Sequence, residues 1–284
     1  MKTSNFVSLS VIAVLMIGCA TKHAEPIRVM SFNIRVATAD DGTNQWMYRR
    51  DAVGAMLKAK QVDLLGLQEV RPAQLDDLVE RLDGYAWVGV SRDGGKQGEF
   101  SPIFYRAKKF DLLEHGVFWL SEQPDQPTRG WDAAFPRVAM WAKFRARSTG
   151  RVFVMLNTHL DHRGKQARIE GAKLIVRRLV GISDGLPIIL TGDLNSRPET
   201  EPYRLLTQPL RDARLVSRSG HTGPIETFTG FHGHPRPPGR PPTVTLDYIL
   251  VSPAVEVLRT ETLMDDWEGR QMSDHRALLA DLKL

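Results

Sequence analysis

A buried strand that ends in a carboxylate and a carboxamide constrains this chain more than any other stretch. Residues 186–190 form an unbroken apolar run with β-branched side chains, which is typical of a strand covered on both faces. The run ends abruptly in TGDLN, residues 191–195. Gly, Asp and Asn are also favoured in turns, so Asp193 and Asn195 alone indicate either a turn or a functional site. The residues at the ends of the other predicted strands are needed to decide between a turn and a functional site.

The rest of the chain alternates apolar strands with amphipathic helices. The patterns predict helices near residues 48–61, 75–82, 166–180 and 201–207. They predict strands at 27–34, 62–70, 85–90, 101–106, 110–120, 137–147, 152–159, 243–252, 255–263 and 276–284, with Pro72 closing the second of these. We find no internal repeat and no linker, so residues 27–284 are expected to form a single domain. The whole chain of 284 residues is long for one domain, but a two-sheet α/β sandwich can hold this length around one core.

Polar side chains stand at the ends of several predicted strands. Those at C-terminal ends are Asn33, Glu69, His159 and Asp193, and those near strand starts are Asp247, Asp274 and His275. In a sheet with antiparallel neighbours the end of one strand lies beside the start of another, so these groups can meet at one edge. Carboxylates gathered there repel one another unless protons or a divalent cation neutralise them. Oxygen ligands without thiolates favour Mg²⁺ or Mn²⁺ over a structural zinc ion.

Seven ordered motifs carry a family resemblance. They are MSFNIR, LGLQEV, SPIFYR, NTHLDH, TGDLNS, LDYILVS and SDHRAL. In order and spacing the segment from Ile27 to Leu284 resembles the endonuclease/exonuclease/phosphatase superfamily, the deoxyribonuclease I-like fold. The resemblance implies an α/β (α+β) protein, a four-layer sandwich of two mixed β-sheets packed face to face with helices on both outer faces. It also implies metal-dependent hydrolysis of phosphate esters.

The resemblance also implies roles for the polar strand ends. Glu69, assisted by Asn33 and Asp274, would hold the Mg²⁺ or Mn²⁺ ion, which neutralises charge on the phosphate and the leaving oxygen. Asp193 would orient and deprotonate the attacking water, while Asn195 positions that water or the phosphate. The segment 191–195 is then expected to be a site rather than a simple turn.

Two histidines and an arginine complete the expected site. His275, oriented by Asp247, would donate to a phosphate oxygen or transfer protons, and His159 would be oriented by Glu99 as its carboxylate partner. Arg137 would bind the phosphate through its fork of donors, although it could instead be an exposed strand residue. A histidine rather than a tyrosine at position 159 separates the chain from the abasic-site repair branch.

Four functions remain open within these expectations. A phosphodiesterase or nuclease-type activity leads, and a nuclease would need an extended basic groove. A phosphomonoesterase would need a compact basic pocket, which Arg35, Arg137, Arg163 and Arg168 could furnish. A phospholipid phosphodiesterase would more often carry an apolar membrane-inserting hairpin, and the sequence shows none. The alternative from another class is a non-catalytic lipoprotein that binds a partner on the same scaffold.

The N-terminal residues read as a targeting segment. Residues 1–18 combine Lys2 with a short apolar core at Phe6–Ile17, and Cys19 follows as a lipidation site. Ordinary cleavable secretion competes with lipidation because Met16 is not the usual Leu, but the apolar run is too short for a transmembrane anchor. The chain has one cysteine, which excludes an intrachain disulfide. We therefore expect an exported monomer, tethered by residues 19–26 to a bacterial membrane on its periplasmic or outer-membrane face.

The charge of the chain is a weaker indication. Its formal net charge of +5 is compatible with an anionic partner such as a phosphate ester or nucleic acid. The Lys and Arg residues are scattered, however, and form no long basic block. Charge alone therefore does not choose between a small phosphoester and a polymer.

Overall fold

The computed structural model describes residues 25–231 and 244–284. The predicted signal peptide at 1–18, the lipidation site Cys19 and residues 20–24 of the tether lie outside the described residues. Within the described part of the chain, none of the helices combines the length and the apolar character needed to cross a bilayer.

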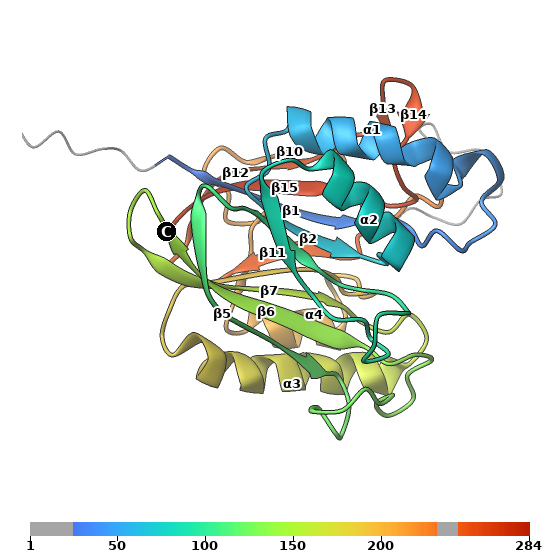
Figure 1. The fold of residues 1–284 in the computed structure, drawn as a ribbon. Helices are drawn as coiled ribbons and strands as arrows, with labels where there is room; N and C mark the ends of the chain where they lie inside the picture. Colours follow the sequence, from blue (N-terminus) through green and yellow to red (C-terminus); the bar gives the residue numbers. More distant parts are fainter. Residues whose placement is uncertain (1–24, 232–243) are drawn as a thin grey trace, which may run out of the picture.

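Two β-sheets form the centre of the molecule (Figure 1). The first has seven strands in the order β10 (His221–Thr222), β12 (Glu256–Thr262), β15 (Leu278–Lys283), β1 (Ile27–Asn33), β2 (Leu64–Gln68), β4 (Ile103–Arg106) and β3 (Tyr85–Val88). The second has six, β5 (Phe110–Trp119), β6 (Val138–Ala146), β7 (Val152–His159), β8 (Ile188–Asp193), β11 (Asp247–Val251) and β9 (Arg211–Asp212). Both sheets are mixed, since β1 pairs with β2 and β7 with β8 in parallel while most other pairs are antiparallel. A small hairpin of β13 (Asp266–Trp267) and β14 (Arg270–Gln271) and a 3-10 turn η1 (Gly42–Asn44) lie outside the sheets.

Helices cover the outer face of each sheet (Figure 1). The helices α1 (Trp46–Ala59) and α2 (Pro72–Arg81) pack on the first sheet, and α3 (Lys165–Ser183) and α4 (Glu201–Thr207) pack on the second. A third apolar layer, with Phe144, Phe153 and Ile249 at its centre, fills the space between the two sheets. The four-layer sandwich predicted from the sequence is confirmed.

The segment after β2 differs from the sequence prediction. Pro72 does not close the strand but begins α2, a position that suits proline because the first helical N–H has no intrahelical acceptor. The strand stops at Gln68 because Glu69 has a φ of 63°, in the left-handed region that a strand cannot contain. This break turns Glu69 out of the sheet and toward the site described below.

Strand register brings the predicted residues to one end of the sandwich. In the second sheet Asp193 pairs with His159 of β7 on one side and with Asp247 of β11 on the other. In the first sheet Asn33 pairs with Gln68, the residue before Glu69. Because β15 runs antiparallel to β1, the segment that precedes β15, with Asp274 and His275, lies at this same end.

A buried polar contact joins the two sheets next to these strand ends. A Cβ atom on Gly66 would lie 2.1 Å from Thr191 Oγ1 and 2.6 Å from Asn157 Oδ1, so only glycine permits this approach. The Asn157 amide donates to the Leu67 carbonyl at 2.7 Å, and its oxygen accepts from Gln68 Nε2 at 2.7 Å. These hydrogen bonds hold β2 against β7 and β8 close to the residues that follow each strand.

Candidate active site

The polar strand ends meet around one cavity of about 440 Å³. The predicted residues that line it are Glu69, Glu99, Arg137, His159, Asp193, Asn195, Asp274 and His275. Asn33 and Asp247 lie directly behind this lining, because each is hydrogen-bonded to residues that form it. Of the predicted site residues, only Cys19 falls outside the described part of the chain. Both ends of the sequence and both sheets therefore contribute to one site.

Asp193 lies at the centre of the cluster and is 1% exposed. Its Oδ1 accepts the backbone N–H of Asn195 at 2.9 Å, and its Oδ2 accepts Asn33 Nδ2 at 3.0 Å. Asn195 has a φ of 44°, a strained conformation that the first of these hydrogen bonds accompanies. Burial, and then the nearby Asp247 carboxylate, raise the pKa of Asp193 above its ordinary value. The carboxylate is therefore fixed in position and more basic than an ordinary aspartate.

His275 is held between two carboxylates. Its Nδ1 lies 2.8 Å from Asp247 Oδ2, and its Nε2 lies 3.8 Å from Asp193 Oδ2. Burial opposes protonation of this ring, but Asp247 and then Asp193 outweigh it and raise the pKa of His275 well above its ordinary value. The raised pKa favours the protonated ring, in which His275 can donate from Nε2 while Asp247 keeps the ring oriented.

Glu69 lines the cavity and is held by two amide donors. Its Oε1 accepts Asn33 Nδ2 at 3.0 Å, and its Oε2 accepts the backbone N–H of Val36 at 2.8 Å. Asp274 also lines the cavity, and Arg35 Nη1 approaches its carboxylate at 3.5 Å. Burial raises the pKa of Asp274, His275 opposes this, and the Glu69 carboxylate adds to it. Glu69 and Asp274 thus both line the cavity with carboxylates.

His159 contacts its neighbours through Nε2. Asn195 Nδ2 lies 3.0 Å from His159 Nε2 and 3.0 Å from the Leu160 carbonyl oxygen, which identifies it as the donor to both. Burial, and then the positive charge of Arg137, lower the pKa of His159 well below its ordinary value. The same Nε2 also lies 3.4 Å from Asp193 Oδ2.

The predicted pairing of Glu99 with His159 is not what the structure shows. Glu99 Oε2 accepts from Arg92 Nη1 at 2.7 Å, while the His159 contact at Nε2 is made by Asn195. Burial raises the pKa of Glu99 and the Arg92 guanidinium opposes this effect. The prediction failed because Arg92, seven residues upstream, reaches Glu99 across a loop that sequence patterns did not resolve. Glu99 still lines the cavity.

Arg137 lies inside the site rather than on an exposed face. It is 5% exposed, its Nε donates to Asp161 Oδ2 at 3.2 Å, and its Nη2 lies 3.1 Å from His162 Nδ1. The alternative of an exposed strand residue is therefore wrong. Arg35 and Arg137 line this cavity, Arg168 lines a neighbouring one and Arg163 lines neither of the two.

Sequence reasoning missed the aromatic rim of the cavity. The Arg92 guanidinium lies 4.4 Å from the centre of the Phe135 ring, and Phe135 stacks on His162 with ring centres 6.0 Å apart. Phe135 is 44% exposed, a large apolar side chain beside a charged cavity. The only sequence signal was a phenylalanine in a polar, proline-containing loop, which has many ordinary explanations.

A buried arginine supports the loops behind the site. Arg49 donates to the carbonyl oxygens of Ile34 at 2.9 Å and Arg35 at 3.4 Å, and also to that of Met272. Burial lowers the pKa of Arg49 to about 10. One side chain thus ties the segment that follows β1 to the segment that leads into Asp274.

Two groups of side chains could hold a metal ion. Ligand atoms of Asp193, Asp247 and His275 lie within 4.8 Å of one another. A metal ion there would need a deprotonated ring nitrogen of His275, whereas the protonated ring would make the same group a proton donor and acceptor. The second group is Glu69 and Asp274, whose carboxylates line the cavity and suit a hard divalent cation.

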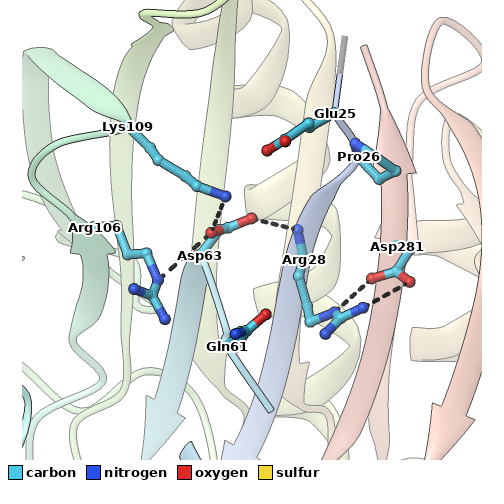
Figure 2. Close-up of a pocket in the computed structure, with 8 residues that line it drawn as sticks. All are labelled: Glu25, Pro26, Arg28, Gln61, Asp63, Arg106, Lys109 and Asp281. Carbon is cyan, nitrogen blue, oxygen red and sulfur yellow. Dashed lines mark hydrogen bonds and ion pairs between the residues drawn. The ribbon is translucent and has the colours of Figure 1, made fainter. Parts of the chain in front are cut away.

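Carboxylates also gather at the opposite end of the same strands. A cavity of about 380 Å³ lies there, beside the start of β1 and the end of β15, and Figure 2 shows the residues that line it. Asp63 lies 2.8 Å from Lys109 Nζ and 3.6 Å from Arg106 Nε, and Asp281 lies 2.7 Å from Arg28 Nε. Asp63 and Asp281 are thus each paired with cations, unlike the crowded carboxylates of the first cavity.

Comparison with known proteins gives a consistent result. The sequence profile described as the Endonuclease/Exonuclease/phosphatase family matches residues 30–275. A mannosyl-6-phosphatase from Bacteroides thetaiotaomicron is 36% identical, with a TM-score of 0.83 over 91% of this chain and 100% of that chain. An endonuclease/exonuclease/phosphatase protein from Bacteroides vulgatus is 37% identical, with a TM-score of 0.86 over 92% of this chain and 100% of that chain.

More distant relatives are longer proteins. The Drosophila melanogaster protein angel is 30% identical over 57% of this chain and 47% of its own length. Rat nocturnin is 26% identical over 75% of this chain and 54% of its own length. The chain thus spans about half the length of these curated relatives.

Proposed function

The chain belongs to the endonuclease/exonuclease/phosphatase family, and from this membership we propose that it is a metal-dependent phosphoesterase acting on a phosphate monoester of a small polar alcohol, such as a sugar. The observation that carries the proposal is the compact cavity of about 440 Å³, in which Arg35 and Arg137 face the cluster around Asp193. A volume of this size suits a small molecule. The arginines provide charge-assisted donors for phosphate oxygens.

The choice of a monoester has a second support. The relative from Bacteroides thetaiotaomicron, similar over 91% of this chain, is described as a mannosyl-6-phosphatase. A nuclease would need a basic groove that follows a nucleic acid strand, whereas Arg35, Arg92 and Arg137 here line one cavity of about 440 Å³. The phosphodiesterase or nuclease-type activity favoured by the sequence therefore has less support, as do the phospholipid phosphodiesterase and the binding-only lipoprotein.

The carboxylates of Glu69 and Asp274 fit the metal ion that the family implies. Glu69 and Asp274, with Asn33 as the brace between Glu69 and Asp193, would hold Mg²⁺ or Mn²⁺, because their donors are oxygens and the described site has no thiolate. When bound, the ion offsets the charge of the phosphate and of the leaving oxygen. It would also relieve the repulsion between Glu69 and Asp274.

Asp193 and His275 would transfer the protons of the reaction. Asp193, with its raised pKa, would take a proton from the attacking water, held in orientation by the Asn195 and Asn33 donors. His275, with Asp247 holding its Nδ1–H, would donate its Nε2 proton to a phosphate or leaving oxygen. Arg137 would contact the remaining phosphate oxygens and fix the phosphorus between these two groups.

A substrate panel tests this function. Purified protein with added Mg²⁺ is expected to release phosphate from sugar phosphates much faster than it cleaves bis(p-nitrophenyl) phosphate or plasmid DNA. A chelator should abolish the reaction, and Mg²⁺ or Mn²⁺ should restore it. Undiminished activity in excess chelator would refute metal dependence. Faster cleavage of DNA, with a steep loss of rate as salt rises, would favour a nuclease instead.

Export and lipidation remain a proposal that rests on the N-terminal sequence. We expect the chain to be processed at Cys19 and retained on a bacterial membrane as a monomer. Labelling with a fatty-acid probe should mark the wild-type protein and not a Cys19→Ser variant. Release of both proteins into the soluble fraction would contradict the anchor and favour ordinary secretion.

A further inference from the structure

A second cavity adjoins the candidate active site at Asn195. It measures about 390 Å³, lies beside the first turns of α3 and α4, and shares Asn195 and Leu246 with the active-site cavity. The Asn195 side chain is held by His159 and by the Leu160 carbonyl oxygen, each at 3.0 Å. A molecule with a phosphate beside His159 can therefore extend past a fixed Asn195 into the second cavity.

Cationic side chains dominate the polar lining of this second cavity. Lys165, Arg168 and Arg197 contribute to it, against one carboxylate, that of Glu201. Arg168 Nη1 donates to the Asp161 carbonyl oxygen at 2.9 Å, which fixes the guanidinium without neutralising it. Within residues 25–231 and 244–284, Lys165 and Arg197 form no ion pair. The lining therefore carries three cations against one carboxylate, which is an excess of positive charge.

A buried serine gives a second indication of a ligand. Ser196 lines the cavity and is 3% exposed, and its hydroxyl has no hydrogen-bond partner among the described residues. A buried hydroxyl without a partner is unfavourable, so such groups call for an explanation. An acceptor oxygen of a bound molecule would satisfy it.

We propose that this second cavity binds a second phosphate group of the substrate, so that the preferred substrate is a bisphosphate of a small polyol or sugar. The proposal rests on the proposed phosphoesterase function. The apolar walls formed by Ile169, Pro202 and Leu246 reduce access of water and strengthen the attraction between the cations and an anion. A neutral sugar ring would need carboxylate or amide partners for its hydroxyl groups rather than three cations.

The test compares two substrates on one protein. The ratio of kcat/KM for glucose 1,6-bisphosphate to that for glucose 6-phosphate is expected to be about tenfold or more in the wild-type protein, chiefly through a lower KM for the bisphosphate. The double substitution Lys165→Ala with Arg197→Ala should reduce the ratio to near one. Any loss of folded protein affects both substrates equally and cancels in the ratio.

Two further variants sharpen the result. Lys173→Ala removes another lysine of α3, which pairs with Glu170 at 2.8 Å outside the cavity, so the ratio should keep its wild-type value. Ser196→Ala should lower the ratio without lowering the free energy of unfolding, because the hydroxyl lacks a partner in the described chain. A wild-type preference for the monophosphate, or a double variant with the wild-type ratio, would overturn the proposal.

A binding measurement separates this proposal from the function on which it rests. Calorimetric titration with glucose 1,6-bisphosphate in chelator should give weaker binding to the Lys165→Ala/Arg197→Ala variant than to wild type, by about tenfold. If neither compound is hydrolysed but this difference in affinity persists, the phosphoesterase function fails while the second phosphate site stands. If both proteins bind the bisphosphate equally, the second site fails whatever the activity.

Discussion

The two ends of the central strands place carboxylates in opposite electrostatic situations. At the end shown in Figure 2, the Asp281 carboxylate accepts hydrogen bonds from Arg28 Nε and from Arg259 Nε, each at 2.7 Å. Burial opposes ionisation there, but these hydrogen bonds outweigh it and lower the pKa of Asp281. At the other end, burial and neighbouring carboxylates raise the pKa of both Asp193 and Asp274. The same strands thus carry one satisfied and one unsatisfied cluster of charge.

The difference shows which end contributes to stability and which to function. Carboxylates paired with cations stay ionised and link strands that are distant in sequence, so removing one is expected to cost folding free energy. Buried carboxylates that crowd together are a cost to the fold, and such costs persist chiefly where chemistry requires them. Three of the non-glycine residues with positive φ, Arg35, Glu69 and Asn195, lie at this second end. Backbone strain and charge repulsion therefore coincide at the candidate active site.

Asp193→Asn, at the catalytic end, is expected to have the largest effect on activity. Loss of the proposed base should lower kcat by about a thousandfold, which corresponds to about 4 kcal/mol of transition-state stabilisation. The free energy of unfolding should stay the same or rise, because a buried carboxylate beside Asp247 disappears. Steady-state kinetics and urea denaturation on the same preparation measure both quantities. A variant that unfolds more readily and keeps its activity would show that Asp193 contributes to stability rather than to catalysis.

Much of the catalytic end could be predicted from the sequence because strands impose simple geometry. Asn33, His159 and Asp193 each stand at the end of a buried apolar strand, so their side chains lie at one end of a sheet. Parallel and antiparallel neighbours then bring the ends and starts of different strands together. The sandwich and the convergence of these residues follow from local patterns plus this rule.

The remaining features depend on contacts that no local pattern specifies. Glu99 meets Arg92 rather than His159 because of the path of the intervening loop, and Phe135 reaches Arg92 from a loop more than 40 residues later in the chain. The opposite end was missed for a similar reason. Asp63 and its partners Arg106 and Lys109 look like ordinary surface charges until the strands are aligned.

Arg49→Met tests whether cations at the catalytic end support the backbone instead of pairing with carboxylates. Four carbonyl oxygens would lose a donor, those of Ile34, Arg35, Asn44 and Met272, so we expect the free energy of unfolding to fall by about 3 kcal/mol. Activity should fall as well, because the segments that carry Asn33 and Asp274 would loosen. The matched control is Arg50→Met on the same helix, where a 41% exposed side chain pairs with Asp77 and less than about 1 kcal/mol is expected. Equal losses in the two variants would argue against a supporting role for Arg49.

Asp63→Ala examines the satisfied end. Asp63 is 2% exposed, accepts the Arg28 backbone N–H at 3.0 Å and pairs with Lys109 at 2.8 Å. Because Lys109 is 45% exposed, the ion pair is partly screened, and we expect a loss of about 2 kcal/mol in the free energy of unfolding. The kcat should stay within about twofold of wild type, since this cluster lies at the far end of the strands. Asp51→Ala, at an 82% exposed carboxylate, is the control and should change stability little. A large loss of activity in Asp63→Ala with stability intact would break the division between the ends.

The smallest expected effect is a pH dependence at Asp281. Its pKa in the folded state is lowered, because the Arg28 and Arg259 hydrogen bonds outweigh the effect of burial. Its contribution to stability is therefore fully present above the unfolded-state pKa of about 3.9 and is lost as the pH falls through the lower folded-state pKa. Arg259 is 53% exposed and Arg28 27%, so we expect a contribution below about 1 kcal/mol. Urea denaturation of wild type and Asp281→Asn should show this difference at pH 6 and a shrinking difference below pH about 3.9. A difference that stays constant into the acid range would show that the ion pairs do not produce it, and that the two ends differ less than their contacts indicate.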